Sequence, residues 1–173
     1  MQQKINNLFL VGPMGVGKTT IGKLVAKALN RSFYDSDKEI EKQTGASIPL
    51  IFELEQEEGF RRRETEMLDY LTLKTGIVLA TGGGAILSEL NRERLATRGY
   101  VIYLKSNVEN LYLRTCRDKN RPLLQIPDPK KKLAEILDLR EPLYRQVAHD
   151  TIDTDVATIK VIVNTIFEQF KAL

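Results

Sequence analysis

The sequence contains one cysteine, one histidine and no tryptophan, and it has no long run of apolar residues. With Cys116 as its only thiol, the chain cannot form an internal disulfide, so a disulfide scaffold is excluded and a reducing compartment is expected. No apolar run approaches the roughly 18 residues that a membrane-spanning helix needs. The net charge of +3 is too small to indicate nucleic-acid binding. We therefore expect neither a membrane nor a nucleic-acid partner.

The composition is that of one ordinary folded domain. The chain has 173 residues, of which 42% are hydrophobic and 28% are charged. A chain of this length is typical of one domain. It buries roughly 70% of the surface that its unfolded chain exposes, so it can fold without a disulfide or a structural metal. The first residues, MQQKINN, leave no room for the apolar part of a signal peptide. We expect a single cytoplasmic domain over residues 1–173.

Short apolar runs alternate with helical periodicity along the chain. Leu8–Val11, Ile77–Ala80 and Tyr100–Leu104 predict buried strands, and Phe33–Tyr34 and Thr151–Ile152 predict weaker ones. Strands without polar alternation, separated by helices, indicate an α/β fold of three layers, with a mostly parallel sheet and helices on both faces. The helical stripes are Ile21, Leu24, Val25, Ala28 and Leu29; Phe60, Met67, Leu68 and Leu71; Leu133, Ile136, Leu137, Tyr144 and Val147; and Ile159, Ile162, Val163 and Ile166.

One segment has neither periodicity nor strand character. Residues 118–129, DKNRPLLQIPDP, contain three prolines and are long for a connection inside a compact domain. A segment of this kind is either a mobile lid over a site or an ordinary surface loop. Its length alone leaves both interpretations open.

The segment after the first predicted strand carries a phosphate-binding motif. Gly12–Thr19, GPMGVGKT, matches G-x-x-x-x-G-K-[ST] at every fixed position and precedes a predicted helix. Its glycines let successive backbone N–H groups turn toward one anion, and the helix adds its positive dipole end. Lys18 can reach the β- and γ-phosphates, and the Thr19 hydroxyl can ligate Mg²⁺. A nucleoside triphosphate with Mg²⁺ is therefore the expected ligand; the alternative is a glycine turn that only joins strand to helix.

Two carboxylates follow the next predicted strand. Asp35 and Asp37 come directly after Phe33–Tyr34, and a right-handed crossover brings this strand end to the same sheet edge as the glycine loop. One carboxylate could hold a water on Mg²⁺ and the other could accept a proton from an attacking hydroxyl. Ser36 and Glu39 also match a helix capping box, so the spacing alone leaves capping and catalysis equally open.

A run of glycines follows the third predicted strand, in Thr81-Gly82-Gly83-Gly84. Glycines allow a ligand to approach the backbone closely, although a tight turn needs them too. This strand does not end in the Asp or Glu of the usual second nucleotide motif. Asp35 is therefore the better candidate to hold Mg²⁺.

Two arginines occupy unusual positions. Arg140 falls on the apolar stripe that includes Tyr144, where a guanidinium needs either a buried ion pair or an anionic ligand. Arg61 follows Phe60, with Glu64 at i+3, which predicts a structural ion pair that is compatible with ligand binding.

The remaining reactive side chains are weaker candidates. Arg114, Arg117 and Arg121 lie in or beside the 118–129 segment and could stabilise phosphoryl charge. His149 has no G-x-S-x-G partner motif, so we expect a surface or helix-end residue. Cys116 has no histidine near it in sequence and is predicted to be a packed thiol.

These motifs occur in an informative order. The glycine loop is shared by many kinases, but the combination of the segments is far more specific. They are GPMGVGKT (Gly12–Thr19), FYDSD (Phe33–Asp37), GFRRRE (Gly59–Glu64), LATGGG (Leu79–Gly84), RPLL (Arg121–Leu124), REPLY (Arg140–Tyr144) and IDTD (Ile152–Asp155). With them the chain resembles the shikimate kinase family from end to end. The resemblance implies a P-loop kinase fold like that of nucleoside-monophosphate kinases.

The resemblance also implies a reaction and its residues. The reaction is Mg²⁺-dependent transfer of the ATP γ-phosphoryl group to the 3-hydroxyl of shikimate, giving shikimate 3-phosphate and ADP for chorismate and aromatic amino-acid biosynthesis. The implied catalytic residues are Asp37, Lys18 and Arg121; the shikimate contacts are Asp37, Arg61, Gly83 and Arg140; and the Mg²⁺ ligands are Thr19 and, through water, Asp35. The implied nucleotide contacts are Gly15, Val16, Gly17, Lys18, Thr19, Thr20, Arg114, Arg121 and Ala157, with Arg114 and the backbone of 155–157 around the adenine. A monomer is implied, with residues 118–129 as its lid.

Two other functions are compatible with the glycine loop. One is another small-molecule kinase, such as a gluconate-kinase-like or adenylate-kinase-like enzyme, although gluconate would need hydroxyl contacts other than Asp37, Arg61 and Arg140. The other is a non-enzymatic nucleotide switch without an acceptor. No guanine-reading N-K-x-D segment is present, which disfavours a GTPase.

Overall fold

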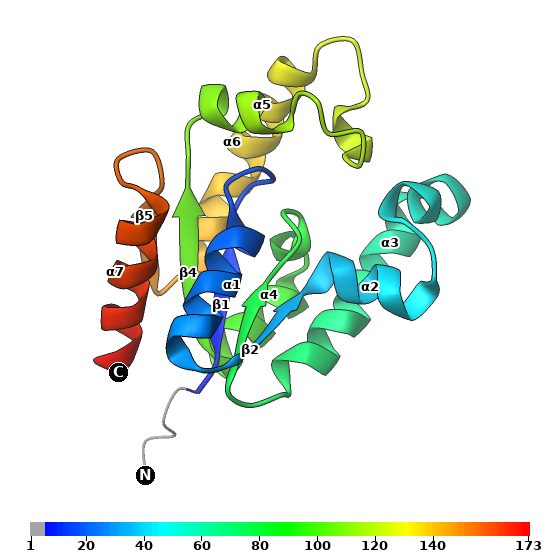
Figure 1. Ribbon diagram of the computed structural model, residues 1–173. Helices are drawn as coiled ribbons and strands as arrows, with labels where there is room; N and C mark the ends of the chain where they lie inside the picture. Colours follow the sequence, from blue (N-terminus) through cyan, green and yellow to red (C-terminus); the bar gives the residue numbers. More distant parts are fainter. Residues whose placement is uncertain (1–5) are drawn as a thin grey trace.

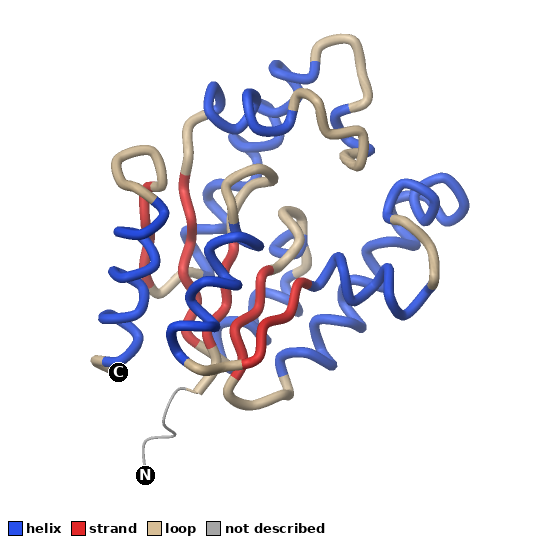
Figure 2. Tube along the Cα trace, viewed as in Figure 1, coloured by secondary structure: helices blue, strands red, loops and turns tan. Residues whose placement is uncertain are grey.

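The computed structural model describes residues 6–173, and its centre is a five-stranded sheet between helices (Figures 1 and 2). The strands are β1 (Leu8–Val11), β2 (Ser32–Asp35), β3 (Ile77–Ala80), β4 (Tyr100–Lys105) and β5 (Asp150–Asp153). Their order is β2-β3-β1-β4-β5, and all of these pairings are parallel. The predicted α/β fold and all of its strands are confirmed. The signal-peptide prediction starts in residues 1–5, which lie outside the described residues.

Helices follow each strand in turn. They are α1 (Lys18–Leu29), α2 (Ser36–Thr44), α3 (Ile48–Thr72), α4 (Glu89–Arg98), α5 (Val108–Thr115), α6 (Pro129–Val147) and α7 (Ile159–Lys171), with short 3₁₀ turns at η1 (Ala85–Leu87) and η2 (Pro122–Leu124). Within residues 6–173, none of these helices has the length and apolar character to cross a membrane.

The sheet separates two hydrophobic cores. Side chains of a strand alternate between the faces, so Leu8 and Leu10 pack into one core while Phe9 and Val11 pack into the other. Helices α1, α5 and α7 contribute to the first core, α2, α3 and α4 to the second, and α6 to both. Because both faces are covered, the central strands are apolar throughout, as their sequences predict.

The predicted helical stripes are mostly correct. Every residue of the stripes in α3 and α6 is buried. In α1 the prediction is partly wrong: Leu24 is 44% exposed and Ala28 is exposed as well, whereas Gly22 and Ala26 face the core. The small residues let α1 approach the sheet, since a Cβ on Gly22 would lie 2.6 Å from the Phe33 ring. In α7, Ile162 and Ile166 are buried, but Ile159 lies near the helix start and is 48% exposed.

The 118–129 segment is attached to the domain at its middle. Its turn η2 places Leu124 in the same buried core as Leu8 and Leu10. An ion pair of 3.0 Å joins Asp118 to Arg121 at its start. The segment is therefore anchored between two irregular stretches, and its role as a lid stays a prediction.

A break in α3 has no proline or other obvious sequence signal. Gln56 has φ 61° and ψ −179°, a conformation that is essentially confined to glycine. Gly59 makes room for the bend, since a Cβ there would overlap Glu55. Two hydrogen bonds of 2.7 and 2.6 Å from the Arg63 guanidinium to Glu55 hold the two halves of the helix together.

Candidate active site

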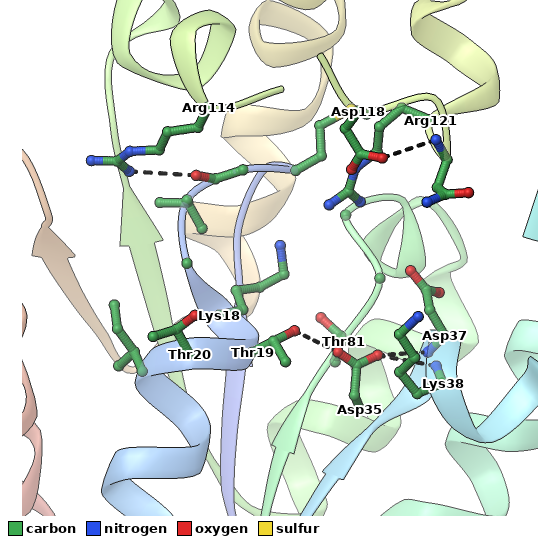
Figure 3. Close-up of a pocket in the computed structure, with 18 of the residues that line it drawn as sticks. Lys18, Thr19, Thr20, Asp35, Asp37, Lys38, Thr81, Arg114, Asp118 and Arg121 are labelled. Atoms are coloured by element: carbon green, nitrogen blue, oxygen red, sulfur yellow. Dashed lines mark hydrogen bonds and ion pairs between the residues drawn. The ribbon is translucent and has the colours of Figure 1, made fainter. Parts of the chain in front are cut away.

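The carboxyl ends of β1, β2 and β3 open into a cavity of about 590 Å³ (Figure 3). The glycine loop after β1, the carboxylates after β2 and the glycine turn after β3 all line it. Arg114, Asp118 and Arg121 line it from the side of α5 and the 118–129 segment. The predicted convergence of these segments at one sheet edge is confirmed, since parallel strands end at the same edge.

The glycine loop encloses the side chain of its own lysine. Gly15 and Gly17 have φ of 81° and 102°, values that favour glycine. Lys18 begins α1 and donates hydrogen bonds from Nζ to the carbonyl oxygens of Gly12 and Pro13, at 2.7 and 2.9 Å. Burial and the positive charge of Arg121 lower the pKa of Lys18 to about 7. A polyphosphate in the loop would supply the negative charge that keeps this ammonium protonated.

Asp35 has two structural roles. Its Oδ2 accepts a hydrogen bond of 2.5 Å from the Thr19 hydroxyl, and its Oδ1 accepts from the backbone N–H groups of Asp37 and Lys38 at 3.0 and 3.2 Å (Figure 3). Asp35 is thus the N-cap of α2, and the predicted Ser36 capping box is wrong because Ser36 is already inside the helix. The Ser36 hydroxyl instead accepts from Gly82 N–H at 3.0 Å.

The donors beside the glycine loop suit Mg²⁺. Within residues 6–173, no group of three or more His, Cys, Asp or Glu side chains could hold a metal ion without further ligands. Thr19 and Asp35 nevertheless bring a hydroxyl and a carboxylate oxygen together beside the phosphate loop. Mg²⁺ in nucleotide sites prefers one or two protein oxygens together with phosphates and water. The residues present therefore fit this ion as a companion of a bound nucleotide.

Asp37 is a buried carboxylate whose pKa lies near neutral pH. It lines the cavity from the first turn of α2, and its Oδ1 is shielded from solvent without a hydrogen-bond partner in the described part of the chain. Burial, together with the negative charges of Glu64 and Asp35, raises the pKa of Asp37 to about 7, while Lys18 and Arg121 oppose the shift. A carboxylate with this pKa can accept a proton at physiological pH.

Arg61 forms the predicted ion pair. Its guanidinium lies 2.8 Å from Glu64 and 3.2 Å from Glu57. Glu64 is 1% exposed, and burial raises its pKa although Arg61 opposes the shift. The second Glu64 oxygen, Oε2, has no partner among residues 6–173.

Arg140 has no such partner. It is 4% exposed, and in the described chain no carboxylate lies within the 4.0 Å of an ion pair. The buried ion pair considered from the sequence is therefore wrong. Glu64 acts on Arg140 only from beyond ion-pair distance. A buried guanidinium without a close counter-charge is costly unless a ligand supplies one, so an anionic ligand is the better explanation.

The glycine turn after β3 lies between the two arginines. A Cβ on Gly83 would lie 3.6 Å from the Arg140 guanidinium, and a Cβ on Gly84 would lie 2.6 Å from Cζ of Arg61. Gly83 also approaches the backbone of Met14 in the glycine loop. The absence of side chains therefore lets two cations and the phosphate loop meet at one turn.

The opposite end of the cavity is formed by α5 and the loop after β5. Arg114 donates to the carbonyl oxygen of Gly15 at 3.4 Å. Asp155 accepts hydrogen bonds from the Ser106 hydroxyl, Asn107 N–H and the Asn110 amide at 2.6, 2.7 and 2.9 Å. These bonds lower the pKa of Asp155 in spite of its burial and attach the loop to the start of α5.

Most of the predicted site residues line the cavity. Those that do are Gly15, Val16, Gly17, Lys18, Thr19, Thr20, Asp35, Asp37, Gly83, Arg114 and Arg121. Arg61 and Arg140 are not among its lining residues but lie against the glycine turn that is. Ala157 packs beside the core rather than into the cavity. Sequence reasoning missed Asp118, whose position three residues before Arg121 was the available signal.

The single histidine and the single cysteine of the sequence lie away from the cavity. His149 is exposed and follows the end of α6, as predicted, and its Nδ1 accepts a hydrogen bond from Val101 N–H at 3.0 Å. Cys116 is exposed at the end of α5, so the prediction of a packed thiol is wrong. It follows the buried Thr115, and the helix rotation turns it to solvent.

Comparison with known proteins gives a consistent set of relatives. A family model described as shikimate kinase matches residues 14–171. The shikimate kinase of Burkholderia thailandensis is 54% identical over 95% of this chain and 90% of its own length, and that of Ralstonia nicotianae is 52% identical over 96% and 88%. Among solved structures, shikimate kinase from Acinetobacter baumannii in complex with shikimate matches with TM-score 0.94 and 52% identity, over 97% of this chain and 94% of that one. A gluconokinase from Sinorhizobium meliloti, 13% identical with TM-score 0.58, covers 99% of this chain and 94% of that one and shares the fold alone.

Proposed function

Since this chain belongs to the shikimate kinase family and is an ATP-dependent phosphotransferase acting on shikimate, we propose that Asp37, Arg61, Gly83 and Arg140 hold the acceptor at the glycine turn. The product is shikimate 3-phosphate, an intermediate of aromatic amino-acid biosynthesis. The observation that carries this assignment of residues is the buried guanidinium of Arg140 beside Gly83, which has no carboxylate within ion-pair distance among residues 6–173. The acceptor carboxylate supplies the missing counter-charge, and Arg61 binds it from the other side of the turn.

Asp37 acts on the hydroxyl that attacks. Its carboxylate lines the cavity between the glycine turn and the glycine loop, and its raised pKa of about 7 lets it take the hydroxyl proton at neutral pH. As the 3-hydroxyl oxygen forms a bond to the γ-phosphorus, the bond to the leaving ADP oxygen breaks and the hydroxyl proton passes to Asp37. Positioning and proton acceptance are thereby combined in one side chain.

The cations around the loop stabilise the transferring group. Lys18 leaves the carbonyl oxygens of Gly12 and Pro13 for the β- and γ-phosphates, and Arg121 contacts the phosphoryl group from the 118–129 segment. Thr19 and, through water, Asp35 would hold Mg²⁺, which neutralises phosphate charge when it is bound. Gly15, Val16, Gly17 and Thr20 contribute the phosphate cradle, while Arg114 and Ala157 flank the adenine.

The whole chain forms one catalytic domain in this proposal. Residues 118–129 close over ATP, because water must be kept from the phosphoryl group. We propose a cytoplasmic monomer in which Asp118 releases Arg121 when the segment closes.

A coupled assay of ADP release tests this function. The protein with ATP and Mg²⁺ is supplied in separate reactions with shikimate, gluconate, AMP or no acceptor. Turnover only with shikimate is expected. Turnover with gluconate or AMP would retain the phosphate site and reject the acceptor pocket, and ATP binding without acceptor-dependent release would favour a nucleotide switch.

A further inference from the structure

Tyr144 connects helix α6 to the glycine turn. It lies one helical turn after Arg140, is 1% exposed, and donates a hydrogen bond of 2.5 Å from its hydroxyl to the carbonyl oxygen of Gly83. Burial raises the pKa of the phenol well above its usual value, so the hydroxyl stays a donor. In the sequence, Tyr144 is one residue of an apolar stripe and the last residue of the REPLY motif. A buried donor aimed at the backbone of the acceptor site is a more specific feature than that.

The hydrogen bond from Tyr144 fixes the orientation of a whole peptide unit. A peptide unit is planar, so fixing the carbonyl of Gly83 also fixes the direction of the N–H of Gly84, which points the opposite way. The turn is held at its start by Thr81, which donates from N–H and from the hydroxyl to the carbonyl oxygen of Leu10, both at 3.1 Å. Gly82 N–H is held by Ser36. Tyr144 binds the Gly83–Gly84 peptide unit, which lies between Arg61 and Arg140.

Glycine cannot hold this peptide unit by itself. It loses more conformational freedom on folding than any other residue. Backbone N–H groups of Ala85 and Leu87 hold the carbonyl oxygens of Gly82 and Gly84, both at 3.1 Å, and Tyr144 holds the carbonyl oxygen of Gly83 between them. Arg140 and Tyr144 come from the same helix, four residues apart. The Tyr144 bond therefore sets the distance between the turn and the Arg140 guanidinium, and through Gly84 the distance to Arg61.

We propose that Tyr144 is a positioning residue for the acceptor acid. It holds the Gly83–Gly84 peptide in the place where Arg61 and Arg140 can both bind the acceptor carboxylate. This proposal rests on the proposed function of the same site. It assigns Tyr144 to the carboxylate end of the acceptor and gives it no contact with ATP. Removing its hydroxyl should therefore weaken acceptor binding while leaving nucleotide binding unchanged.

The structure offers a matched control in Tyr103. The two rings stack with centroids 5.1 Å apart, and both are almost fully buried. The Tyr103 hydroxyl is buried too, but it has no hydrogen-bond partner among residues 6–173. Tyr103→Phe thus removes a buried hydroxyl from the same aromatic pair without removing a bond to the turn.

Steady-state kinetics of the purified wild type, Tyr144→Phe and Tyr103→Phe test the proposal. For Tyr144→Phe we expect the KM for shikimate to rise about five-fold, the effect of one ordinary hydrogen bond, with the KM for ATP unchanged. For Tyr103→Phe we expect both constants to equal those of the wild type. In ¹H–¹⁵N spectra the Gly84 amide signal should move in Tyr144→Phe and stay in place in Tyr103→Phe.

The same experiments distinguish failure of the proposed function from failure of the Tyr144 proposal. If the wild type does not phosphorylate shikimate, the proposed function is wrong, whatever the variants do. If the wild type is active but Tyr144→Phe changes both KM values equally, or matches Tyr103→Phe, Tyr144 has only a structural role. As a further check, Tyr144→Phe should lower kcat/KM for shikimate by less in an Arg140→Lys background than in the wild type, because the two residues serve one contact.

Discussion

Asp37 Oδ1 and Glu64 Oε2 converge on one point of the glycine turn: a Cβ on Gly82 would lie 2.7 Å from each. Both oxygens are buried and neither has a partner in the described chain. Two carboxylates that share a buried space disfavour simultaneous ionisation, so the pair retains a proton to higher pH than either group would alone. Burial, and after it the charge of Glu64, raises the pKa of Asp37 to about 7, a value at which a carboxylate can accept a proton near neutral pH.

Asp37→Asn should remove most of the turnover while ATP still binds. The amide keeps the shape but cannot accept the hydroxyl proton, and loss of a general base typically lowers kcat by about 10²–10⁴-fold. Glu41→Gln is a matched control, because Glu41 also lines the cavity from α2 but is paired with Lys38. ADP release and equilibrium ATP binding measure the two effects. An unchanged kcat in Asp37→Asn would contradict the assignment.

The same substitution should stabilise the unliganded protein at alkaline pH. The folded-state pKa of Asp37 is raised above its ordinary value of 3.8 to about 7, so the folded state binds more protons between these two values. The stability that this group contributes is fully present below about pH 4 and is lost as the pH rises through 7. Asp37→Asn should therefore gain at least about 1 kcal/mol over the wild type at pH 8 and much less at pH 4. Urea unfolding of both proteins at pH 8 and pH 4 measures this gain in the free energy of unfolding. A gain of the same size at the two pH values would contradict the prediction.

Arg140→Ala should impair acceptor binding selectively. Loss of a charge-assisted contact to a carboxylate corresponds to about 10–100-fold in the KM for shikimate, and the KM for ATP should change little. Arg145→Ala on the same helix is the control, since Arg145 is exposed and pairs only with Glu141. Removal of Arg140 leaves Glu64, which it influences from a longer distance, in its ion pair of 2.8 Å with Arg61. Equal effects on both substrates would instead indicate a structural role.

Gln56→Gly should raise the free energy of unfolding. Gln56 holds a φ of 61° and a ψ of −179° in α3, and relief of such backbone strain is worth about 1 kcal/mol or more. Asn30→Gly provides the comparison, because Asn30 ends α1 in the left-handed conformation that asparagine tolerates. Denaturant unfolding measures both variants. Destabilisation by Gln56→Gly would mean that its side chain contributes more than the strain costs.

Residues 118–129 should become protected when both substrates are bound. Leu124 is already buried, so the change in hydrogen exchange should be concentrated in the flanking stretches rather than at η2. The comparison is between the free protein, the protein with a non-hydrolysable ATP analogue, and the protein with that analogue plus shikimate. Exchange that stays the same in all three states would rule out closure of this segment.

The local features of this protein follow from residues that are neighbours along the chain. The glycine loop was predictable because its chemistry depends on adjacent backbone groups, and the loop forms as the motif implies, with Lys18 at the helix start. The strands were predictable because β1 and β3 are apolar on both faces. The family motifs also placed Asp37 and Arg121 at the cavity.

The contacts of the individual side chains depend on how the helices and strands pack together. Whether Arg140 is paired depends on carboxylates from distant parts of the chain, and none reaches it in the described residues. The approach of Asp37 to Glu64 across Gly82 depends on how α3 packs beside α2. The break at Gln56 is not marked by a proline, and the two hydrogen bonds between Arg63 and Glu55, eight residues apart, hold it. Contacts of this kind are set by side chains that are far apart in sequence, and residue patterns report only on neighbours along the chain.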